Sequence, residues 1–279
     1  MKVFSWQDIL DIKAGKSEFK SFFDEGSALT IGSFDGTHRG HFQLFSAVSD
    51  YRKENPSIKT GVVTFLFPPK FLNRENNANL VLSTLSGKLS IFESLGFDFA
   101  LAIDFSYDFS RISGEDFLSL MKDVCSMQFL AVGSDFRCGY KNDTGTSELA
   151  EFSRRFHFSL RVIDEVLING EKVSSSKIRD CIKSGNLEKA SVFLGYHYTL
   201  DFSDLAPSIE KIESGLIRIA SGKIRQIIPA VGRYKATAFF SGSVSLNTIL
   251  SVDKDFLLLE IPPEYLSFDL EKIEIKACI

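Results

Sequence analysis

The amino-acid sequence predicts an α/β protein with a parallel sheet, followed by a small, mostly antiparallel β domain. Between residues 28 and 195, apolar β-type runs alternate with segments of helical period, which is the pattern of a parallel sheet covered by helices on both faces. After Gly195, short strand-like pieces follow one another, separated by Gly, Pro, Ser and Asp. We therefore expect one domain over residues 1–198 and a second, barrel-like domain over 199–279.

The first β-α-β unit is the clearest part of the pattern. ALTIGSF (28–34) is strand-like, and the segment HFQLFSAVSDYRKE that follows places Leu44, Val48 and Tyr51 at helical spacing. A second strand-like run, TGVVTFLF (60–67), comes after Pro56. The pattern predicts two parallel strands joined by a helix.

The same alternation continues along the chain. Further strands are predicted at 97–105, 129–136 and 159–166. One predicted helix carries Leu85, Leu89, Phe92 and Leu95 on one face and stops near Gly96, a second opens at the capping pair Ser113 and Asp116, and a third spans about 146–156. Beyond Gly195 the strand-like pieces are TLDF, GLIRIA, YKATAFF, FLLLEIP and KIEIKA.

The composition is that of a soluble globular protein. The hydrophobic fraction is 44%, the charged fraction is 24%, the net charge is −4 and the pI is about 5.7. This charge gives no global attraction to nucleic acid or to an anionic membrane surface, so an anionic ligand needs a local site. The 27 phenylalanines are spread through the chain, which favours core packing over a stacking cluster.

No run approaches the length of a membrane-spanning helix, and the first residues lack an apolar signal region. We therefore expect a cytoplasmic protein that acts on small molecules, with no nucleic-acid or membrane partner and an oligomeric state that the sequence leaves open. Four scattered cysteines without a CxxC pair argue against a zinc site or a redox motif.

TIGSFDGTHRGH (30–41) is the most informative stretch, because it lies where a predicted strand ends and a helix begins. In a parallel sheet this is the carboxyl edge, where ligands bind. Gly32 and Gly36 would let backbone amides approach a phosphate chain, and the helix start near Arg39 adds a positive dipole. On one helical turn, His38 and His41 could both donate to the same phosphate. The alternative is a tight turn with ordinary histidines.

Two further segments add polar groups to this edge. GSDFRCG (133–139) follows the fourth strand, although such a turn is also compatible with plain structural capping. VSSSKIRD (173–180) places consecutive serines before a short helix that carries Lys177 and Arg179. Hydroxyls, helix-terminal amides and a guanidinium together favour an anion clamp, the alternative being a serine N-cap beside a solvated arginine.

With these motifs in order, the chain resembles the bacterial FAD synthetase family, which joins an FMN adenylyltransferase of nucleotidyltransferase (HxGH, Rossmann-like) fold to a riboflavin kinase. The resemblance covers residues 28–200. Its GxFDGxHxGH motif is matched throughout, and GSDFRCG and SSSKIR resemble the family's GxDFxFG and SSTxIR segments. KLSIFESLGFD (88–98) and LGYHY (194–198) resemble further family segments.

Two segments depart from the family pattern. The second strand reads FLFPP (65–69), with Pro68 where the family usually has a histidine near the flavin. Residues 200–279 contain no GxPTxN loop, which in the family binds ATP and metal for the kinase reaction, although PAVGRYKATAFF (229–240) resembles a strand of its barrel. The resemblance therefore implies a degenerate kinase barrel.

The resemblance implies transfer of AMP from ATP to FMN, giving FAD and pyrophosphate, with Mg²⁺ on the triphosphate. The implied catalytic residues are His38, His41 and Arg179. The implied ATP- and phosphate-binding residues are Gly32, Ser33, Phe34, Asp35, Gly36, Gly40, Ser175 and Ser176. The implied flavin- or nucleotide-binding residues are Asp135, Phe136, Arg137 and Phe65, and no protein ligand is implied for the metal.

Two other functions stay open from the sequence. One is an HxGH nucleotidyltransferase with a different acceptor, such as phosphopantetheine or nicotinamide mononucleotide. The other is a non-catalytic flavin- or nucleotide-binding protein, which the altered FLFPP segment and the reduced tail would favour. The intact HxGH motif favours an enzyme.

Overall fold

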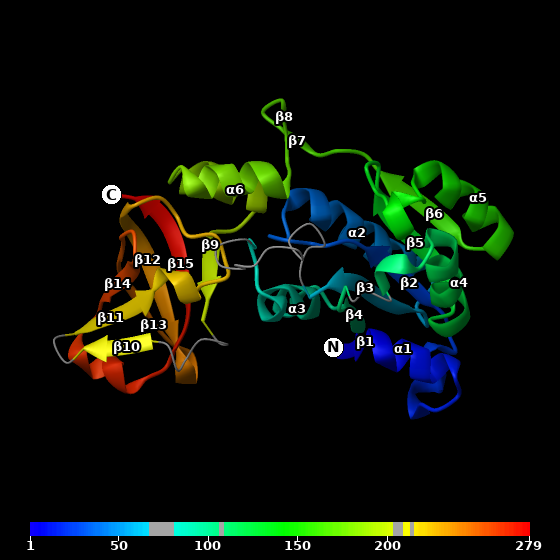
Figure 1. Cartoon of the computed structure of the whole chain (residues 1–279), viewed down its shortest axis with the longest axis horizontal. Coiled ribbons are helices and arrows are strands. Elements are labelled where there is room, and N and C mark those ends of the chain that lie inside the picture. Colours follow the sequence, from blue (N-terminus) through cyan, green and yellow to red (C-terminus); the bar gives the residue numbers. More distant parts are fainter. Residues whose placement is uncertain (67–80, 106–108, 203–208, 213–214) are drawn as a thin grey trace. The chain divides into compact units, whose positions relative to one another are not determined.

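The computed structural model describes residues 1–66, 81–105, 109–202, 209–212 and 215–279 (Figure 1). These residues divide into two compact units. The described part of the first unit comprises residues 1–34, 40–66, 89–105 and 109–166. That of the second comprises 35–39, 81–88, 167–202, 209–212 and 215–279.

The first unit is built on a six-stranded, fully parallel sheet with the order β1-β4-β3-β2-β5-β6. Its strands are β1 (Lys2–Ser5), β2 (Ser27–Ile31), β3 (Lys59–Phe65), β4 (Phe99–Ile103), β5 (Met127–Gly133) and β6 (Ser159–Ile163). All five residues of both β2 and β4 are buried, as expected for strands covered on both faces.

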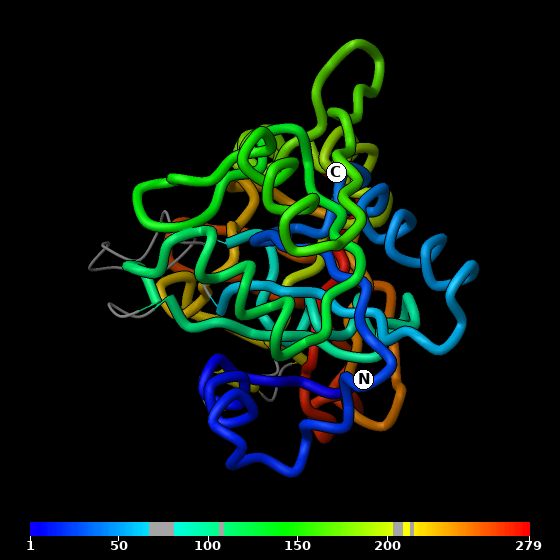
Figure 2. Tube along the Cα trace, turned by 90° about the vertical axis from the view of Figure 1, so that its right-hand side faces the viewer, coloured from blue at the N-terminus to red at the C-terminus, as the bar shows by residue number. Residues whose placement is uncertain are grey.

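Helices cover both faces of this sheet. They are α1 (Trp6–Lys13), α2 (Arg39–Glu54), α3 (Leu85–Ser94), α4 (Gly114–Val124) and α5 (Thr146–Phe156). Buried side chains of α1, α4 and α5 form one hydrophobic core with the sheet, and those of α2 and α3 form a second core with it. In Figure 2, α1 in dark blue and α2 in lighter blue lie well apart.

The second unit contains a seven-stranded antiparallel sheet with the order β10-β11-β14-β13-β12-β15-β9. Its strands are β9 (Tyr198–Asp201), β10 (Ile209–Ile212), β11 (Leu216–Ala220), β12 (Gly232–Phe240), β13 (Val244–Val252), β14 (Phe256–Glu260) and β15 (Leu270–Cys278). The unit also holds the hairpin β7 (Leu167–Ile168) and β8 (Glu171–Lys172), and the helices α6 (Ser175–Lys183) and α7 (Leu187–Leu194).

Short 3-10 helices connect several of these elements. They are Glu18–Phe23, Phe109–Arg111, Tyr140–Asn142, Ser221–Lys223, Ser241–Ser243 and Pro263–Ser267. Of the helices in the described part of the chain, none combines the length and apolar character that crossing a membrane requires.

The structure confirms the predicted fold class, a parallel α/β part followed by an antiparallel β part. The predicted capping pair is present, because Ser113 accepts a hydrogen bond from the amide of Asp116 at the start of α4. Gly96, at φ 78°, follows the end of α3 as predicted. The sequence analysis missed helix α1 and strand β1, which is an edge strand beside β4.

Candidate active site

The turn after β2 has an unusual backbone. Phe34 (φ 46°), Gly36 (φ 82°) and Thr37 (φ 30°) all lie in the left-handed region, although only one of them is a glycine. A bulky residue such as phenylalanine adopts this conformation only where the surrounding structure enforces it, and such strain clusters at functional sites. The turn ends at Arg39, where α2 begins.

Asp35 is the centre of the contacts that hold this turn. Its side chain is buried, and one carboxylate oxygen accepts hydrogen bonds from the amides of Leu82 (2.8 Å) and Ser83 (3.2 Å). The other oxygen is paired with the guanidinium of Arg179, which is also buried. A buried carboxylate needs such partners, because it would otherwise be costly to desolvate.

The start of helix α6 contacts the same residue. Ser175 donates its hydroxyl hydrogen bond to the backbone oxygen of Asp35 at 2.8 Å. Ser174 is the N-cap, accepting from the amide of Lys177, while Ser176 is exposed. The structure thus joins the first and third sequence motifs, 140 residues apart, through Asp35.

Gly36 is enclosed on three sides. Its amide donates to the Ser83 hydroxyl (3.0 Å), and its carbonyl accepts from the Tyr196 hydroxyl (2.7 Å). A Cβ atom at this position would lie 2.6 Å from Leu82 Cδ1. The glycine is therefore required by close packing as well as by its positive φ.

The amides of the two glycines differ from the sequence expectation. We expected both to face a phosphate, but the Gly36 amide donates to Ser83 and the Gly32 amide donates to the carbonyl of Val63 at 3.0 Å. Gly32 thereby extends the pairing of β2 with β3, and the Ser33 carbonyl beside it accepts from Thr64. In this structure the glycines shape the turn.

Phe34 also differs from its predicted role in phosphate binding. Its side chain is 1% exposed and packs in the core against the rings of Phe45 and Phe92. The ring of His41 stands edge-on to Phe34, with centroids 5.1 Å apart. Phe34 therefore supports the imidazole of His41.

The two histidines occupy different positions around the start of α2. His38 is buried and immediately precedes the helix, whereas His41 lies in its first turn and is half-buried. Gly40 lies between them in the same turn. Only His41 therefore lies on the helical turn that we expected to carry both.

The titratable groups near Asp35 that the sequence analysis did not single out include Lys88, which is buried, and Tyr196, which is half-buried. Burial lowers the pKa of Lys88, which is 2% exposed, to about 8, while the nearby Asp35 carboxylate acts in the opposite direction. Burial also raises the pKa of Tyr196 above its usual range, and Asp35 adds to this. Tyr196 could have been found from the LGYHY segment, but nothing in the sequence marks Leu82 or Ser83.

The GSDFRCG segment follows β5, which pairs in parallel with β2, so both strands end at the same edge of the sheet. Asp135 and Arg137 are exposed there, and Phe136 is half-buried. Arg137 extends toward Gly145, at the start of α5. The amide of Phe136 closes a tight turn by donating to the Gly133 carbonyl.

Phe65 ends β3 at that edge and packs against Phe105 and Phe109, with ring centroids 5.8 Å and 6.2 Å away. The rest of the FLFPP segment beyond Leu66, including Pro68, lies outside the described residues.

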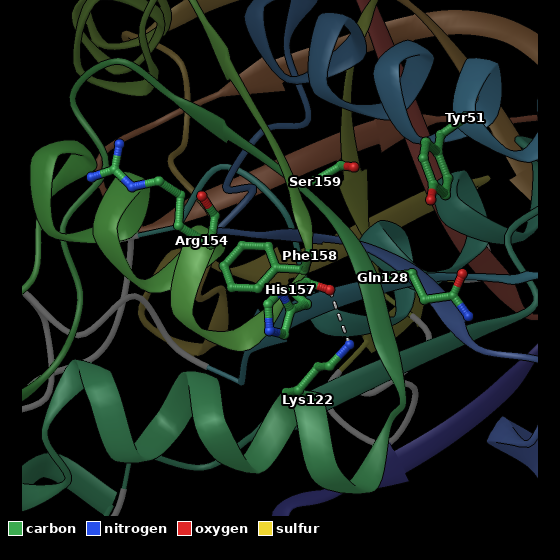
Figure 3. Close-up of a pocket in the computed structure, with 8 residues that line it drawn as sticks. Tyr51, Lys122, Gln128, Arg154, His157, Phe158 and Ser159 are labelled. Atoms are coloured by element: carbon green, nitrogen blue, oxygen red, sulfur yellow. Dashed lines mark hydrogen bonds between the residues drawn. The ribbon is translucent and has the colours of Figure 1, made fainter.

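A hollow of about 570 Å³ at the opposite edge of the parallel sheet is a different feature (Figure 3). Its lining includes Gln128 and Ser159, near the amino ends of β5 and β6. Lys122 donates there to the carbonyl of His157, drawn as a dashed line in Figure 3, and also to the carbonyl of Met127. Helices α4 and α5 end at this hollow, and the cationic side chains of Lys122 and Arg154 line it.

Comparison with known proteins gives consistent matches. A family model described as FAD synthetase matches residues 20–177, more than half of the chain. The bifunctional riboflavin kinase/FMN adenylyltransferase of Escherichia coli (strain K12) is 31% identical over 180 residues, which make up 63% of this chain and 56% of that protein. The protein of the same name from Buchnera aphidicola subsp. Acyrthosiphon pisum is 29% identical, with the same coverage.

The chain spans a little more than half the length of these curated relatives. Among solved structures, a macrolide-efflux protein from Streptococcus pneumoniae has a TM-score of 0.80 and 17% identity, covering 100% of this chain and 91% of that one. At this identity the likeness concerns the fold alone. The extent of the family-model match, together with the relatives, shows that the chain belongs to the FAD synthetase family.

Proposed function

We propose that this protein is an FMN adenylyltransferase, which transfers AMP from ATP to FMN and releases pyrophosphate. The observation that carries the proposal is the contact of Asp35 with both Arg179 and Ser175, because it joins the HxGH turn to the start of α6. Two segments whose sequences each favour anion binding are therefore in contact, which supports the proposal of a single site. The family membership and the names of the relatives support the same reaction.

The reaction needs neutralised charge more than it needs a base. An oxygen of the FMN phosphate, already an anion near pH 7, attacks the α-phosphorus of ATP. The bond from the α-phosphorus to the bridging oxygen breaks, and that oxygen leaves with pyrophosphate. The protein has to hold two polyanions in line and stabilise the charge on the leaving group.

The residues around Asp35 suit this task. We propose that His41 and His38 donate to the phosphates of ATP at the positive end of α2. Arg179, oriented by Asp35, stabilises the β- and γ-phosphates together with the exposed hydroxyl of Ser176. Ser175 was expected to contact phosphate as well, but its hydroxyl proton is donated to the backbone oxygen of Asp35, so its part in the proposal is to hold the turn against α6. In this proposal Asp35 touches no phosphate and fixes the direction of the guanidinium.

The acceptor side is proposed at the ends of β3 and β5. Asp135, Phe136 and Arg137 would contact the flavin mononucleotide, and Phe65 would provide an aromatic surface. The supporting observation is that β2, β3 and β5 are neighbours in one parallel sheet and end at the same edge. Ligands of such sheets bind at that edge.

Mg²⁺ is proposed to accompany the triphosphate. No three His, Cys, Asp or Glu side chains gather into a metal site within the described ranges. Mg²⁺ commonly keeps waters and binds substrate phosphates through few protein ligands, so the proposal assigns it to the triphosphate and names no protein ligand. Bound there, the ion would neutralise part of the phosphate charge.

We further propose that residues 1–198 form the adenylyltransferase domain and that residues 199–279 form a β-rich domain without riboflavin kinase activity. The absence of a GxPTxN segment from the sequence of 200–279 supports this. Phosphoryl transfer depends on positioned phosphate and metal contacts, which that loop would supply.

The acceptor is tested by incubating the purified protein with ATP and Mg²⁺ and one phosphorylated acceptor at a time. The acceptors are FMN, nicotinamide mononucleotide and phosphopantetheine, and the products are separated by chromatography. We expect FAD and pyrophosphate in equal amounts, and no adenylylation of the other two. Adenylylation of another acceptor without FAD would overturn the assignment.

A further inference from the structure

Residues 81–84 connect the HxGH turn to the antiparallel sheet within the second unit. On one side, the amides of Leu82 and Ser83 hold the carboxylate of Asp35, and the Ser83 hydroxyl accepts from Gly36. Residues 81–84 therefore hold the HxGH turn in place through these hydrogen bonds.

On the other side, the same segment is held by Gln226, which precedes β12. Its side-chain nitrogen donates to the carbonyls of Leu82 (2.9 Å) and Thr199 (2.8 Å), and its side-chain oxygen accepts from the amide of Asp201 (2.7 Å). Gln226 is only 2% exposed. A buried amide with three such bonds is costly to disturb, because each lost partner leaves a buried polar group.

Backbone pairing reinforces this contact. Val81 forms a parallel β-bridge with Gln226: its amide donates to the carbonyl of Arg225 (3.2 Å), and its carbonyl accepts from the amide of Ile227 (2.8 Å). The segment is thus attached to the β part of the unit by its main chain as well as by the glutamine side chain.

Asp201, the last residue of β9, holds the other end of the segment. Its carboxylate accepts from the hydroxyls of Thr84 (2.6 Å) and Ser86 (2.8 Å). The Thr84 hydroxyl also accepts from the amide of Gly87, in the first turn of α3. The start of α3 is therefore tied to β9.

We infer that Gln226 and Asp201 are positioning residues of the adenylyl-transfer site. Leu82 receives Gln226 at its carbonyl and donates to Asp35 from its amide, so one residue separates the glutamine from the carboxylate that pairs with Arg179. The β-rich region then contributes to turnover by holding the residues of the site in position. The inference rests on the proposed function for its effect on turnover.

The roles follow from where the transition-state charge lies. Loss of the Gln226 contacts lets residues 81–84 relax, which loosens Asp35 and widens the orientations open to Arg179. A group that stabilises the leaving pyrophosphate acts mainly in the transition state, so its misplacement lowers kcat more than it raises KM. Misplacement of this kind is known to cost up to about 10²-fold in rate.

The test compares Gln226→Met with wild type and with Thr237→Val. Met keeps the side-chain length and removes the three hydrogen bonds. Thr237 is also buried in the antiparallel sheet, where its hydroxyl bonds Asn247 across β12 and β13, and it makes no hydrogen bond to residues 81–84. Circular dichroism and the melting temperature confirm that each variant is folded.

We expect kcat for FAD formation to fall about tenfold or more in Gln226→Met, with KM for ATP changed less than about threefold. Hydrogen exchange of peptides covering 35–38 and 81–88 should quicken about tenfold or more in this variant. Thr237→Val should leave kcat and the hydrogen-exchange rates of both peptides unchanged. A folded Gln226→Met variant with wild-type kcat, or with unchanged exchange in these peptides, overturns the inference.

A milder variant covers the case in which Gln226→Met does not fold. Ser86→Ala removes one half-buried hydroxyl that donates to Asp201, and we expect faster exchange confined to 81–88 with a kcat loss of about twofold to fivefold. Unchanged exchange and kcat would overturn the role of Asp201. If the wild type forms no FAD, the proposed function fails, while the exchange of 35–38 and 81–88 still decides whether the β part holds the turn.

Discussion

Asp35 is an anion at the centre of a site that we propose to bind other anions. Its carboxylate is buried and already has three donors, the amides of Leu82 and Ser83 and the guanidinium of Arg179. An exposed carboxylate would repel a triphosphate. The charge of Asp35 is instead compensated by its three donors, and its pairing with Arg179 restricts the orientations of the guanidinium. In the proposed site, Asp35 therefore acts by fixing the position of Arg179.

Asp35→Asn should therefore strongly destabilise the protein. The substitution removes the carboxylate charge that pairs with the buried guanidinium of Arg179, and removal of one partner from a buried ion pair costs about 3–5 kcal/mol. Urea unfolding measures the change. Asp50→Asn is the control, because Asp50 pairs with Lys53 on the surface and should have little effect. Equal stability of the two variants would contradict the role of Asp35.

His41→Ala should lower kcat by about 10² or more, with a smaller change in ATP affinity, because the hydrogen bond proposed for His41 would strengthen as charge builds on the leaving phosphate. Steady-state kinetics separate the two parameters. His157→Asn serves as the control, since His157 ends α5 at the other edge of the sheet and asparagine tolerates its positive φ of 54°. A His41→Ala enzyme with near wild-type kcat would leave the histidine a purely structural part.

At the residue scale, sequence reasoning located the motif residues and missed their partners. The HxGH and SSSKIR segments could be found because their residue types agree with one chemistry. The contact between them could not, since Asp35 and Arg179 are separated by 144 residues. The burial of Phe34 was missed because a bulky residue with positive φ is set by packing against α2 and α3, which the local sequence does not encode.

At the element scale, the turn after β2 depends on the segment that begins at Val81. Gly36→Ala should destabilise the protein by about 2–4 kcal/mol, because the new Cβ would collide with Leu82 in addition to the cost of φ 82°. Gly170→Ala is the matched control. It has φ 77° and open space around it, so only the backbone cost of about 1–2 kcal/mol applies.

Chemical denaturation of both glycine variants gives this comparison. A Gly36→Ala protein no less stable than Gly170→Ala would show that the turn yields to the added methyl group. That result would also contradict the proposal that residues 81–84 hold the turn in place.

Lys88, near the start of α3, makes the stability of the protein depend on pH. Its pKa is lowered from 10.5 to about 8, so between these values the unfolded chain binds more protons at this site than the folded protein does. The cost of the buried charge is fully present below pH 8 and is relieved as pH rises toward 10.5. The slope reaches about 1.4 kcal/mol per pH unit for one group.

Lys88→Met removes this pH dependence. Urea unfolding of wild type and variant at pH 7, 8, 9 and 10 should therefore show the difference in unfolding free energy shifting in favour of the wild type above pH 8. A difference that stays constant across this range would mean that Lys88 titrates at the same pH in both states.

Most elements of the parallel sheet could be predicted because their signals are local. Apolar runs located β2 to β6 in order, and the capping residues located α4. β1 was missed because only one of its four residues is fully buried, so it carries almost no hydrophobic pattern. The contacts of residues 81–84 were missed for a different reason. Leu82 and Ser83 bind Asp35 through backbone amides, which every sequence has, and the side-chain partners of the segment are distant along the chain.

At the scale of the whole molecule, the antiparallel region belongs to a fold that extends beyond the segment matched by the family model. The family model matches residues 20–177, whereas the likeness to the Streptococcus pneumoniae structure extends over the entire chain. The β-rich region is therefore part of a fold that recurs with little sequence identity. Its contacts from Gln226 and Asp201 to residues 81–86 give it a structural role that does not depend on kinase activity.

The central claim is that this chain makes FAD from FMN and cannot make FMN from riboflavin. The most direct measurement follows the purified protein with ATP and Mg²⁺ in two arms, one with FMN and one with riboflavin, and quantifies FMN, FAD and pyrophosphate by chromatography. We predict FAD with equimolar pyrophosphate in the first arm, and neither FMN nor FAD in the second. Absence of FAD from the FMN arm, or FMN formed at enzymatic rates from riboflavin, would contradict the claim.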